Sequence, residues 1–182
     1  MRQFFASVLE IVEITLVAIA AVFLIRSFLV QPFLVSGSSM VPSFSNGDYL
    51  LIDEITYRFR LPERGEVVVF RYPNNESTYF IKRIIGMPGE RVEIKINRVM
   101  IFNNDNPQGF ALTENYLPRA VTTSGNMEFR LKSNEYLMLG DNRSYSFDSR
   151  SWGPLSINDI VGLVRFRLWP VNSLLAFVAP QY

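Results

Sequence analysis

Short runs of β-forming residues, separated by turn residues, make up most of the chain after position 35. The clearest runs cover residues 48–52, 66–70, 79–85, 91–96 and 160–168, and RVEIKI at 91–96 alternates apolar and polar side chains. Such alternation is typical of a strand with one buried and one solvated face. No segment of helical periodicity and convincing length follows position 35. The pattern predicts an all-β domain of antiparallel sheets that form a barrel-like structure.

The N-terminal part of the chain is apolar instead. The run FFASVLEIVEITLVAIAAVFLI at residues 4–25 is long enough to cross a hydrocarbon core of about 30 Å. Glu10 and Glu13 interrupt it, and the uncharged remainder at residues 14–25 also fits a signal-peptide core or a buried helix. A small-x-small cleavage site occurs only inside the run, which disfavours a cleaved signal. We therefore expect one retained transmembrane helix.

The chain length of 182 residues limits the number of domains. With residues 1–30 assigned to a membrane anchor, about 150 residues remain, which is enough for one domain with a proper core. We expect a β-rich domain over residues 31–182, with a loop insertion around residues 103–126, where strand signals are weak. The apolar tail at residues 168–182 contains two prolines, and we expect it to pack on the domain or to lie at the membrane surface.

The chain contains neither cysteine nor histidine. These absences exclude disulfides, zinc sites made of thiolates or imidazoles, a cysteine nucleophile and a Ser-His-Asp triad. The net charge is +1 without long basic or acidic runs, so charge gives no indication of a nucleic-acid partner. We expect no metal, no cofactor and no nucleic acid, and any hydrolytic chemistry must depend on carboxylates, lysine or tyrosine.

One candidate for such chemistry is the serine-rich stretch SGSSMVPS at residues 36–43, which follows the apolar run. A serine nucleophile in this chain requires a neutral lysine as its base. Of the three lysines, Lys82 alone lies between apolar neighbours, whereas Lys95 fits a solvated strand face and Lys132 lies in a polar stretch. Catalysis near neutral pH needs a pKa about 3 units below the usual 10.4, which burial of the amine can supply. The alternatives are a juxtamembrane linker and a solvent-facing lysine.

A second candidate is the stretch LGDNRSYSFDSRSWGPL at residues 139–155. Asp148 and Arg150 are two residues apart, so in an extended segment they share a face and can pair. The stretch does not match the calcium-loop pattern, which excludes metal binding of that kind. A structural turn held by Asx and serine hydrogen bonds is the alternative interpretation.

These stretches together resemble the type I signal peptidases, membrane-anchored Ser/Lys endopeptidases that remove signal peptides from exported proteins. SGSSMVPS is similar to the nucleophile segment of that family, in which the serine directly precedes Met-x-Pro. YFIKRIIGMPGE at residues 79–90 resembles its lysine segment, and GDNRSYSFDSRSWGPL at residues 140–155 resembles its last motif. GDYLLIDEITY and RGEVVVF look like intervening strands. The resemblance covers nearly the whole chain except the region around residues 103–126.

The resemblance assigns roles to individual residues. It implies that Ser39 is the nucleophile and Lys82 the general base. It also implies that Ser146 hydrogen-bonds the Lys82 amine and holds it toward Ser39. The expected supporting residues of the same loop are Asp141, Asn142, Arg143, Asp148 and Arg150, the last two as an ion pair.

The sequence departs from the family pattern at Gly37. Some members carry a serine two residues before the nucleophile, and its hydroxyl joins the oxyanion hole. Here the hole would depend on backbone N–H groups, that of Ser39 among them, unless Ser36 or Ser38 supplies a hydroxyl. Loss of one donor can cost on the order of 10²-fold in rate.

We expect the substrate peptide to bind in extended form, by strand addition, between residues 33–36 and the strand that contains Lys82. Apolar side chains there would line shallow pockets suited to small residues, such as alanine, at the first and third positions before the cut. The expected substrate-binding residues are Phe33, Val35, Ser36, Phe80 and Ile81.

The expected partners are pre-proteins that carry signal peptides and the lipid bilayer. The chain is then a single-pass protein of the plasma (inner) membrane, with a cytoplasmic N-terminus and an extracytoplasmic catalytic domain. A cytosolic, self-cleaving Ser/Lys protease of the repressor type is the alternative among enzymes, although the apolar run and the lack of a DNA-binding segment count against it. A membrane-tethered β-domain that binds exported chains without cleaving them is the alternative from another class.

Overall fold

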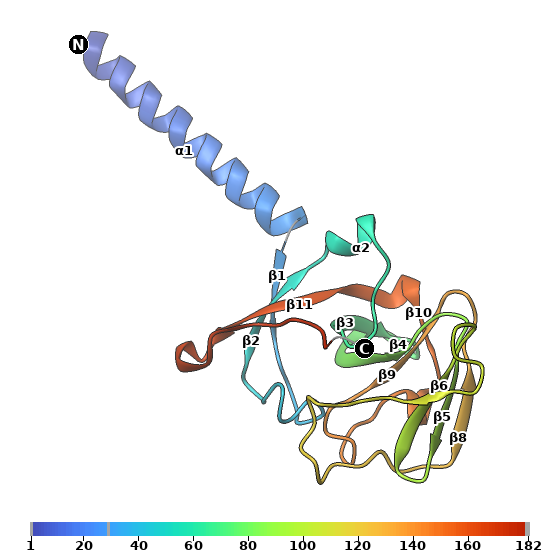
Figure 1. The fold of residues 1–182 in the computed structure, drawn as a ribbon. Coiled ribbons are helices and arrows are strands. Elements are labelled where there is room, and N and C mark those ends of the chain that lie inside the picture. Colours follow the sequence, from blue (N-terminus) through green and yellow to red (C-terminus); the bar gives the residue numbers. More distant parts are fainter. Residues whose placement is uncertain (1, 29, 181–182) are drawn as a thin grey trace.

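The computed structural model describes the backbone of residues 2–28 and 30–180 and, within them, the side chains of residues 7–22 and 31–180. Its first element is a long helix, α1 (Arg2–Phe28), which points away from the strands (Figure 1). The N-terminal run is therefore helical, although part of the predicted anchor at residues 1–30 lies outside the described residues. Within the described part of the chain, no helix is long and apolar enough to cross a membrane.

Eight antiparallel strands form the larger of two sheets (Figure 1). They pair in the order β1-β2-β11-β3-β4-β9-β10, and β12 adds to β11. This sheet carries both catalytic candidates, because Lys82 lies on β4 and Ser39 follows β1. Its strands are β1 (Val30–Leu34), β2 (Tyr49–Asp53), β3 (Val67–Tyr72), β4 (Asn75–Gly86), β9 (Glu135–Leu139), β10 (Leu155–Ser156), β11 (Ile160–Trp169) and β12 (Leu175–Ala176).

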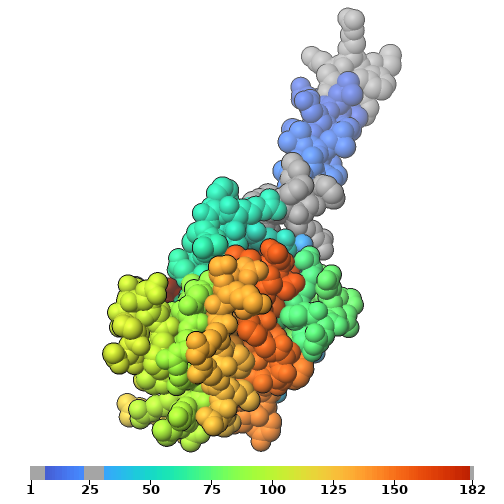
Figure 2. Space-filling view, turned by 90° about the vertical axis from the view of Figure 1, so that its right-hand side faces the viewer, coloured from blue at the N-terminus to red at the C-terminus, as the bar shows by residue number. Residues whose placement is uncertain are grey.

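Four further antiparallel strands form a smaller sheet in the order β7-β6-β5-β8. Val92 and Ile94 of β5 are fully buried, whereas Arg91, Glu93 and Lys95 are not, as the alternation in the sequence predicts. Figure 2 shows this part of the chain, in yellow-green and yellow-orange, at the end of the domain away from α1. The strands are β5 (Arg91–Lys95), β6 (Arg98–Phe102), β7 (Phe110–Ala111) and β8 (Met127–Arg130).

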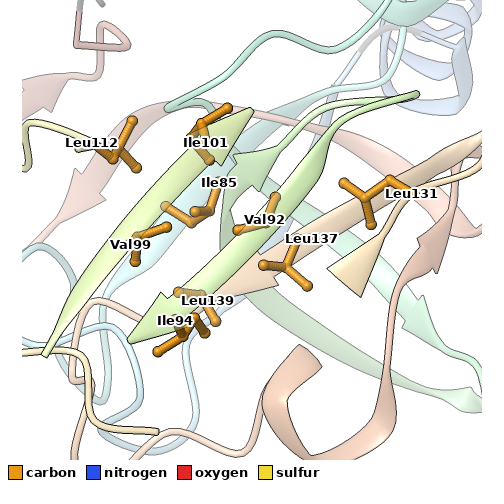
Figure 3. Close-up of a cluster of buried hydrophobic side chains, with 9 residues drawn as sticks. All are labelled: Ile85, Val92, Ile94, Val99, Ile101, Leu112, Leu131, Leu137 and Leu139. Carbon is orange, nitrogen blue, oxygen red and sulfur yellow. The ribbon is translucent and has the colours of Figure 1, made fainter. Parts of the chain in front are cut away.

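Apolar side chains from both sheets fill the space between them (Figure 3). Ile85 near the end of β4 and two leucines of β9 meet the buried side chains of the small sheet. Packing of this kind holds the end of the lysine strand in one position. The buried residues of this cluster are Ile85, Val92, Ile94, Val99, Ile101, Leu112, Leu131, Leu137 and Leu139.

Helices after α1 are short in the described residues, as predicted. The C-terminal tail packs on the domain, which is one of the two placements expected for it: β12 pairs with β11, and the ring of Phe177 lies 4.2 Å from that of Phe44, centre to centre. The short helices are α2 (Thr56–Phe59), α3 (Ser149–Trp152), η1 (Ile157–Asp159) and η2 (Val171–Ser173).

The five strand predictions are confirmed by β2, β3, β4, β5 and β11. The predicted barrel is wrong, because β1 and β10 lie at opposite ends of the strand order and no pairing joins them among the described residues. The small sheet packs over β9 and the end of β4 and covers the apolar residues there. The large sheet can therefore stay open without exposing this part of its core.

Candidate active site

The structure brings Ser39 and Lys82 together from distant parts of the sequence. The distance between Lys82 Nζ and Ser39 Oγ is 2.8 Å. Nζ also donates a hydrogen bond of 2.9 Å to the carbonyl oxygen of Ile81. The hydroxyl and the amine are thus within the range needed for direct proton transfer between them.

Burial changes the acidity of the Lys82 amine. Lys82 is only 3% exposed, and this burial lowers the pKa of its ammonium from 10.5 to about 8. The carboxylates of Asp148 and Asp141 act in the opposite direction, because negative charge favours the protonated amine. A large fraction of Lys82 is therefore neutral near pH 8, and a neutral amine can accept the proton of Ser39.

We expect kcat/KM for peptide cleavage to rise with pH and to reach half its maximum near pH 8. Lys82 must be neutral to accept a proton, so activity is lost as pH falls through the folded-state pKa. In Asp148→Asn the rise of kcat/KM is expected at lower pH, because the substitution removes a negative charge that favours the protonated form of Lys82. A pH profile of kcat/KM for both proteins measures this, and a flat profile between pH 6 and 9 would contradict it.

Ser39 lies in the serine-rich stretch at residues 36–43, which forms a turn after β1. We call it the nucleophile turn, because Ser39 is the candidate nucleophile. Its backbone is fixed on both sides of Ser39. The Ser39 carbonyl accepts a hydrogen bond of 3.0 Å from Asn142 N, and the Asn142 side-chain amide donates one of 3.0 Å to the carbonyl of Ser38. Met40, which follows Ser39, is buried in the same apolar cluster as Phe44. These contacts hold the turn so that the Ser39 side chain faces Lys82.

Gly37 adopts a left-handed backbone conformation, with φ of 98°, and its N–H donates a hydrogen bond to Asn46 Oδ1. This conformation is strained for a residue with a Cβ, so a serine would not adopt it freely. In the described part of the chain the N–H of Ser39 donates to no other group, which leaves it available for an oxyanion. The sequence offers Ser36 and Ser38 as further hydroxyl donors to an oxyanion. Ser36 lines a pocket next to Ser39 and Lys82, the two residues that we call the dyad, and Ser38 does not.

Asp148 is fully buried at the centre of the predicted supporting loop. Its carboxylate accepts hydrogen bonds from Arg150 Nε and Nη2, at 2.8 and 2.9 Å, and from the N–H of Gly140 at 3.0 Å. The predicted ion pair between Asp148 and Arg150 is thus present. Together these bonds tie the end of β9 to the start of α3.

Arg143 braces the other side of the same loop. Its guanidinium donates a 3.0 Å hydrogen bond to the carbonyl of Gly140 and a 3.0 Å hydrogen bond to the carboxylate of Glu114. Glu114 lies in the region around residues 103–126, where the sequence indicates only a loop insertion. This region therefore supports the site through a buried arginine, although it is poor in strands.

Another buried ion pair, which the sequence does not predict, joins β4 to the loop. Arg83 Nη2 and Nε lie 2.6 and 2.9 Å from the two carboxylate oxygens of Asp141. Arg83 directly follows Lys82 in the chain, and alternation along a strand places its side chain on the opposite face. A buried arginine needs a carboxylate partner, and that requirement is the signal that could have identified the pair.

Ser146 lies beside the dyad but does not make the expected hydrogen bond to Lys82. Its hydroxyl oxygen is buried and has no hydrogen-bond partner in the described part of the chain. Ser146 packs instead against Gly140, where a Cβ would collide with its Oγ and would lie 2.5 Å from the carbonyl oxygen of Ser39. The Lys82 amine is oriented by the Ile81 carbonyl and by Ser39.

A pocket of about 120 Å³ opens next to the dyad and includes Ser39 and Lys82 in its lining. One wall comes from β1 and the segment after it, and the other comes from β4. Its lining combines apolar side chains with the polar groups of Ser36, Ser39 and Lys82, so a small apolar side chain can enter it next to the dyad. All of the predicted substrate-binding residues line it: Phe33, Val35, Ser36, Phe80 and Ile81.

Two free strand edges meet at this pocket. Among the described strands, β1 pairs only with β2, and β4 pairs only with β3 as far as Lys82. Four antiparallel pairings separate β1 from β4 in the strand order, so the two strands run in the same direction. The ring centres of Phe33 and Tyr79 are 5.7 Å apart across the gap. An extended peptide can therefore pair with either edge and present its side chains to the pocket.

Comparison with known proteins gives one consistent result. The sequence profile of the signal peptidase family, peptidase S26, matches residues 8–169. A signal peptidase I of Leptolyngbya laminosa is 36% identical over 159 residues, which cover 82% of this chain and 74% of that protein. Signal peptidase IB of Staphylococcus aureus is 32% identical over 168 residues, which cover 86% of this chain and 87% of that protein. A crystal structure of a signal peptidase I from Enterococcus faecalis V583, 26% identical, aligns with a TM-score of 0.47 over 57% of this chain and 97% of that chain.

Proposed function

The chain belongs to the signal peptidase family, peptidase S26, and we propose that it removes signal peptides from exported pre-proteins with Ser39 as nucleophile and Lys82 as general base. Its relationship to the signal peptidases I makes it a serine protease. The observation that carries the choice of residues is the 2.8 Å distance between the Ser39 hydroxyl and a buried lysine amine.

In the proposed mechanism, neutral Lys82 accepts the Ser39 proton while Oγ attacks the carbonyl carbon of the scissile peptide bond. The bond to nitrogen then breaks, Lys82 returns the proton to the departing amine of the mature chain, and an ester remains on Ser39. Water, deprotonated by Lys82, then attacks the ester carbonyl carbon. The bond to Ser39 Oγ breaks, and Lys82 returns the proton to Oγ, which restores the hydroxyl and the neutral amine. The free N–H of Ser39 supports a role in holding the oxyanion, and Ser36 is the hydroxyl that could assist it.

The substrate is proposed to bind as an added strand between the free edges of β1 and β4. Backbone hydrogen bonds to these edges give affinity without regard to sequence, and the pocket provides selectivity. Side chains at the first and third positions before the cut would enter the space lined by Phe33, Val35 and Ile81. The apolar side chains of this lining support a preference for small apolar residues there.

We further propose that α1 anchors the chain in the membrane, with the N-terminus in the cytoplasm and the β-domain outside. The uncharged segment at residues 14–25 supports this role. Ser39 lies only 11 residues beyond the end of α1, a length that spans at most about 40 Å when fully extended. The dyad would then stay close to the bilayer, where the cleavage site of a translocated signal peptide lies.

The proposal is tested with the full chain in detergent and a pre-protein that has alanine at the first and third positions before the cut. We expect one cut after the first of these positions, detected by mass spectrometry, and at least about 10²-fold slower cleavage when tryptophan replaces that alanine, because overpacking strains the pocket. Ser39→Ala is the control and is expected to show no cut. Continued cleavage by Ser39→Ala would overturn the dyad, and binding of the pre-protein without cleavage by the unaltered chain would favour a non-catalytic role.

A further inference from the structure

The open edge of β4 ends at the catalytic lysine. From Arg83 onward β4 pairs with β9, in the register Arg83 to Leu139 and Ile84 to Met138. A peptide strand added to β4 can therefore pair with it only up to Lys82. The part of the substrate that follows the cut cannot continue along the same edge.

The loop after β9 lies on the other side of the point at which the substrate must leave β4. Asn142 is hydrogen-bonded to the carbonyls of both Ser38 and Ser39, so the loop is attached to the nucleophile turn. Gly140 approaches Ser39 so closely that a side chain has no space between them. A bound peptide must leave the sheet at the dyad and continue over the surface of this loop.

Two aromatic side chains are exposed on that surface. Tyr145 is 80% exposed and Phe147 is 52% exposed, and they flank Ser146, which packs against Gly140 next to the backbone of Ser39. The ring of Phe147 makes edge contacts with Tyr72 and with Phe80, at centre distances of 5.9 and 6.3 Å. Because Phe80 lines the substrate pocket, the aromatic surface is continuous with the part of the site that holds the signal peptide.

Tyr145 differs from Phe147 in its surroundings. Among the described residues, its ring makes no contact with another aromatic ring, and its backbone N–H is bonded to the carbonyl of Asn142. The backbone is therefore held while the side chain is free to receive a partner. An exposed ring on a fixed backbone binds apolar side chains at little cost in conformational entropy.

We propose that Tyr145, with Phe147 beside it, binds the first residues of the mature chain and favours an apolar or aromatic side chain at the second position after the cut. The proposal rests on the proposed function, because it takes Ser39 as the point of cleavage. If it holds, the enzyme selects its substrates by residues of the mature chain as well as by residues of the signal peptide.

The test compares three peptides, cleaved by the full chain in detergent. One has phenylalanine at the second position after the cut, one has glycine there, and one ends at the first residue after the cut. In Tyr145→Ala, kcat/KM is expected to fall about 3- to 10-fold for the phenylalanine peptide, the size of one aromatic contact. It is expected to change less than about twofold for the other two, and Tyr145→Phe is expected to restore the preference.

A matched control is Phe59→Ala on α2, which removes an aromatic ring that is 84% exposed outside the site. We expect it to leave all three rates unchanged. An equal loss on all three peptides in Tyr145→Ala would show a merely structural role and would overturn the proposal. Cleavage by Ser39→Ala would contradict the dyad, whereas failure of the Tyr145 comparison alone would leave the proposed function intact.

Discussion

Replacement of Lys82 by methionine is expected to reduce cleavage of a signal-bearing precursor by at least about 10⁴-fold, because every proton transfer in the mechanism uses this amine. Methionine has a similar length and no proton-accepting group. The pocket and the nucleophile turn keep their packing, so the loss reports the chemistry. Single-turnover rates with the precursor in detergent measure it.

The same substitution is expected to stabilise the folded chain. The pKa of Lys82 falls from 10.5 to about 8 on folding, so between these pH values the unfolded state binds more protons and stability rises with pH. Below pH 8 the full cost of burying the ammonium is present, about 3 kcal/mol for a shift of this size. Lys82→Met removes that cost, so the gain in unfolding free energy should be largest at pH 7 and smaller near pH 10.

Chemical denaturation at pH 7 and pH 10 measures the change in stability. Lys95→Met on β5 is the control, because this lysine is exposed and lies outside the site. It is expected to alter neither activity nor stability by a measurable amount. Retained cleavage in Lys82→Met, or a loss of stability at pH 7, would argue against a buried lysine base. Active sites commonly carry such a cost, since a group adjusted for chemistry is rarely the one that packs best.

The sequence predicts the strands because their signal is local. Alternation within residues 91–96 needs no knowledge of the partner strand, and the structure has β5 there. The dyad candidates are also found from short stretches, together with the absence of histidine and cysteine. What the sequence does not contain is which strand edges stay free. The barrel prediction is wrong for this reason, because closure depends on contacts between the two ends of the sheet.

Long-range polar contacts are missed for the same reason. Arg83 and Asp141 are 58 residues apart, and neither flanking sequence identifies the other as its partner. Gly140 is part of a recognisable motif, yet its function in the packing follows only from the positions of Ser39 and Ser146, which leave no space for a Cβ. The expected hydrogen bond from Ser146 to Lys82 depends on side-chain orientation, which a motif does not specify. Local patterns thus identify the reactive groups, and tertiary contacts determine how they are held.

Gly140→Ala is expected to lower kcat by about 10²-fold, because displacing a reacting group by about 1 Å has an effect of this size. The added Cβ would collide with Ser146 Oγ and lie 2.5 Å from the Ser39 carbonyl oxygen, and Gly140 N is bonded to buried Asp148. The loop cannot move away freely, so the nucleophile turn must move. KM should change less than kcat, since the pocket walls on β1 and β4 are not touched.

Gly162→Ala on β11 is the matched control for this substitution. Its Cβ would lie 2.6 Å from the carbonyl oxygen of Asp53 and 2.8 Å from Ile52 Cγ2, a similar collision outside the site. Both variants are expected to lose about 1–3 kcal/mol of unfolding free energy through overpacking. Only Gly140→Ala should lose kcat, measured below its unfolding temperature. Equal losses of kcat in the two variants would mean that general destabilisation, and not the position of Ser39, determines the rate.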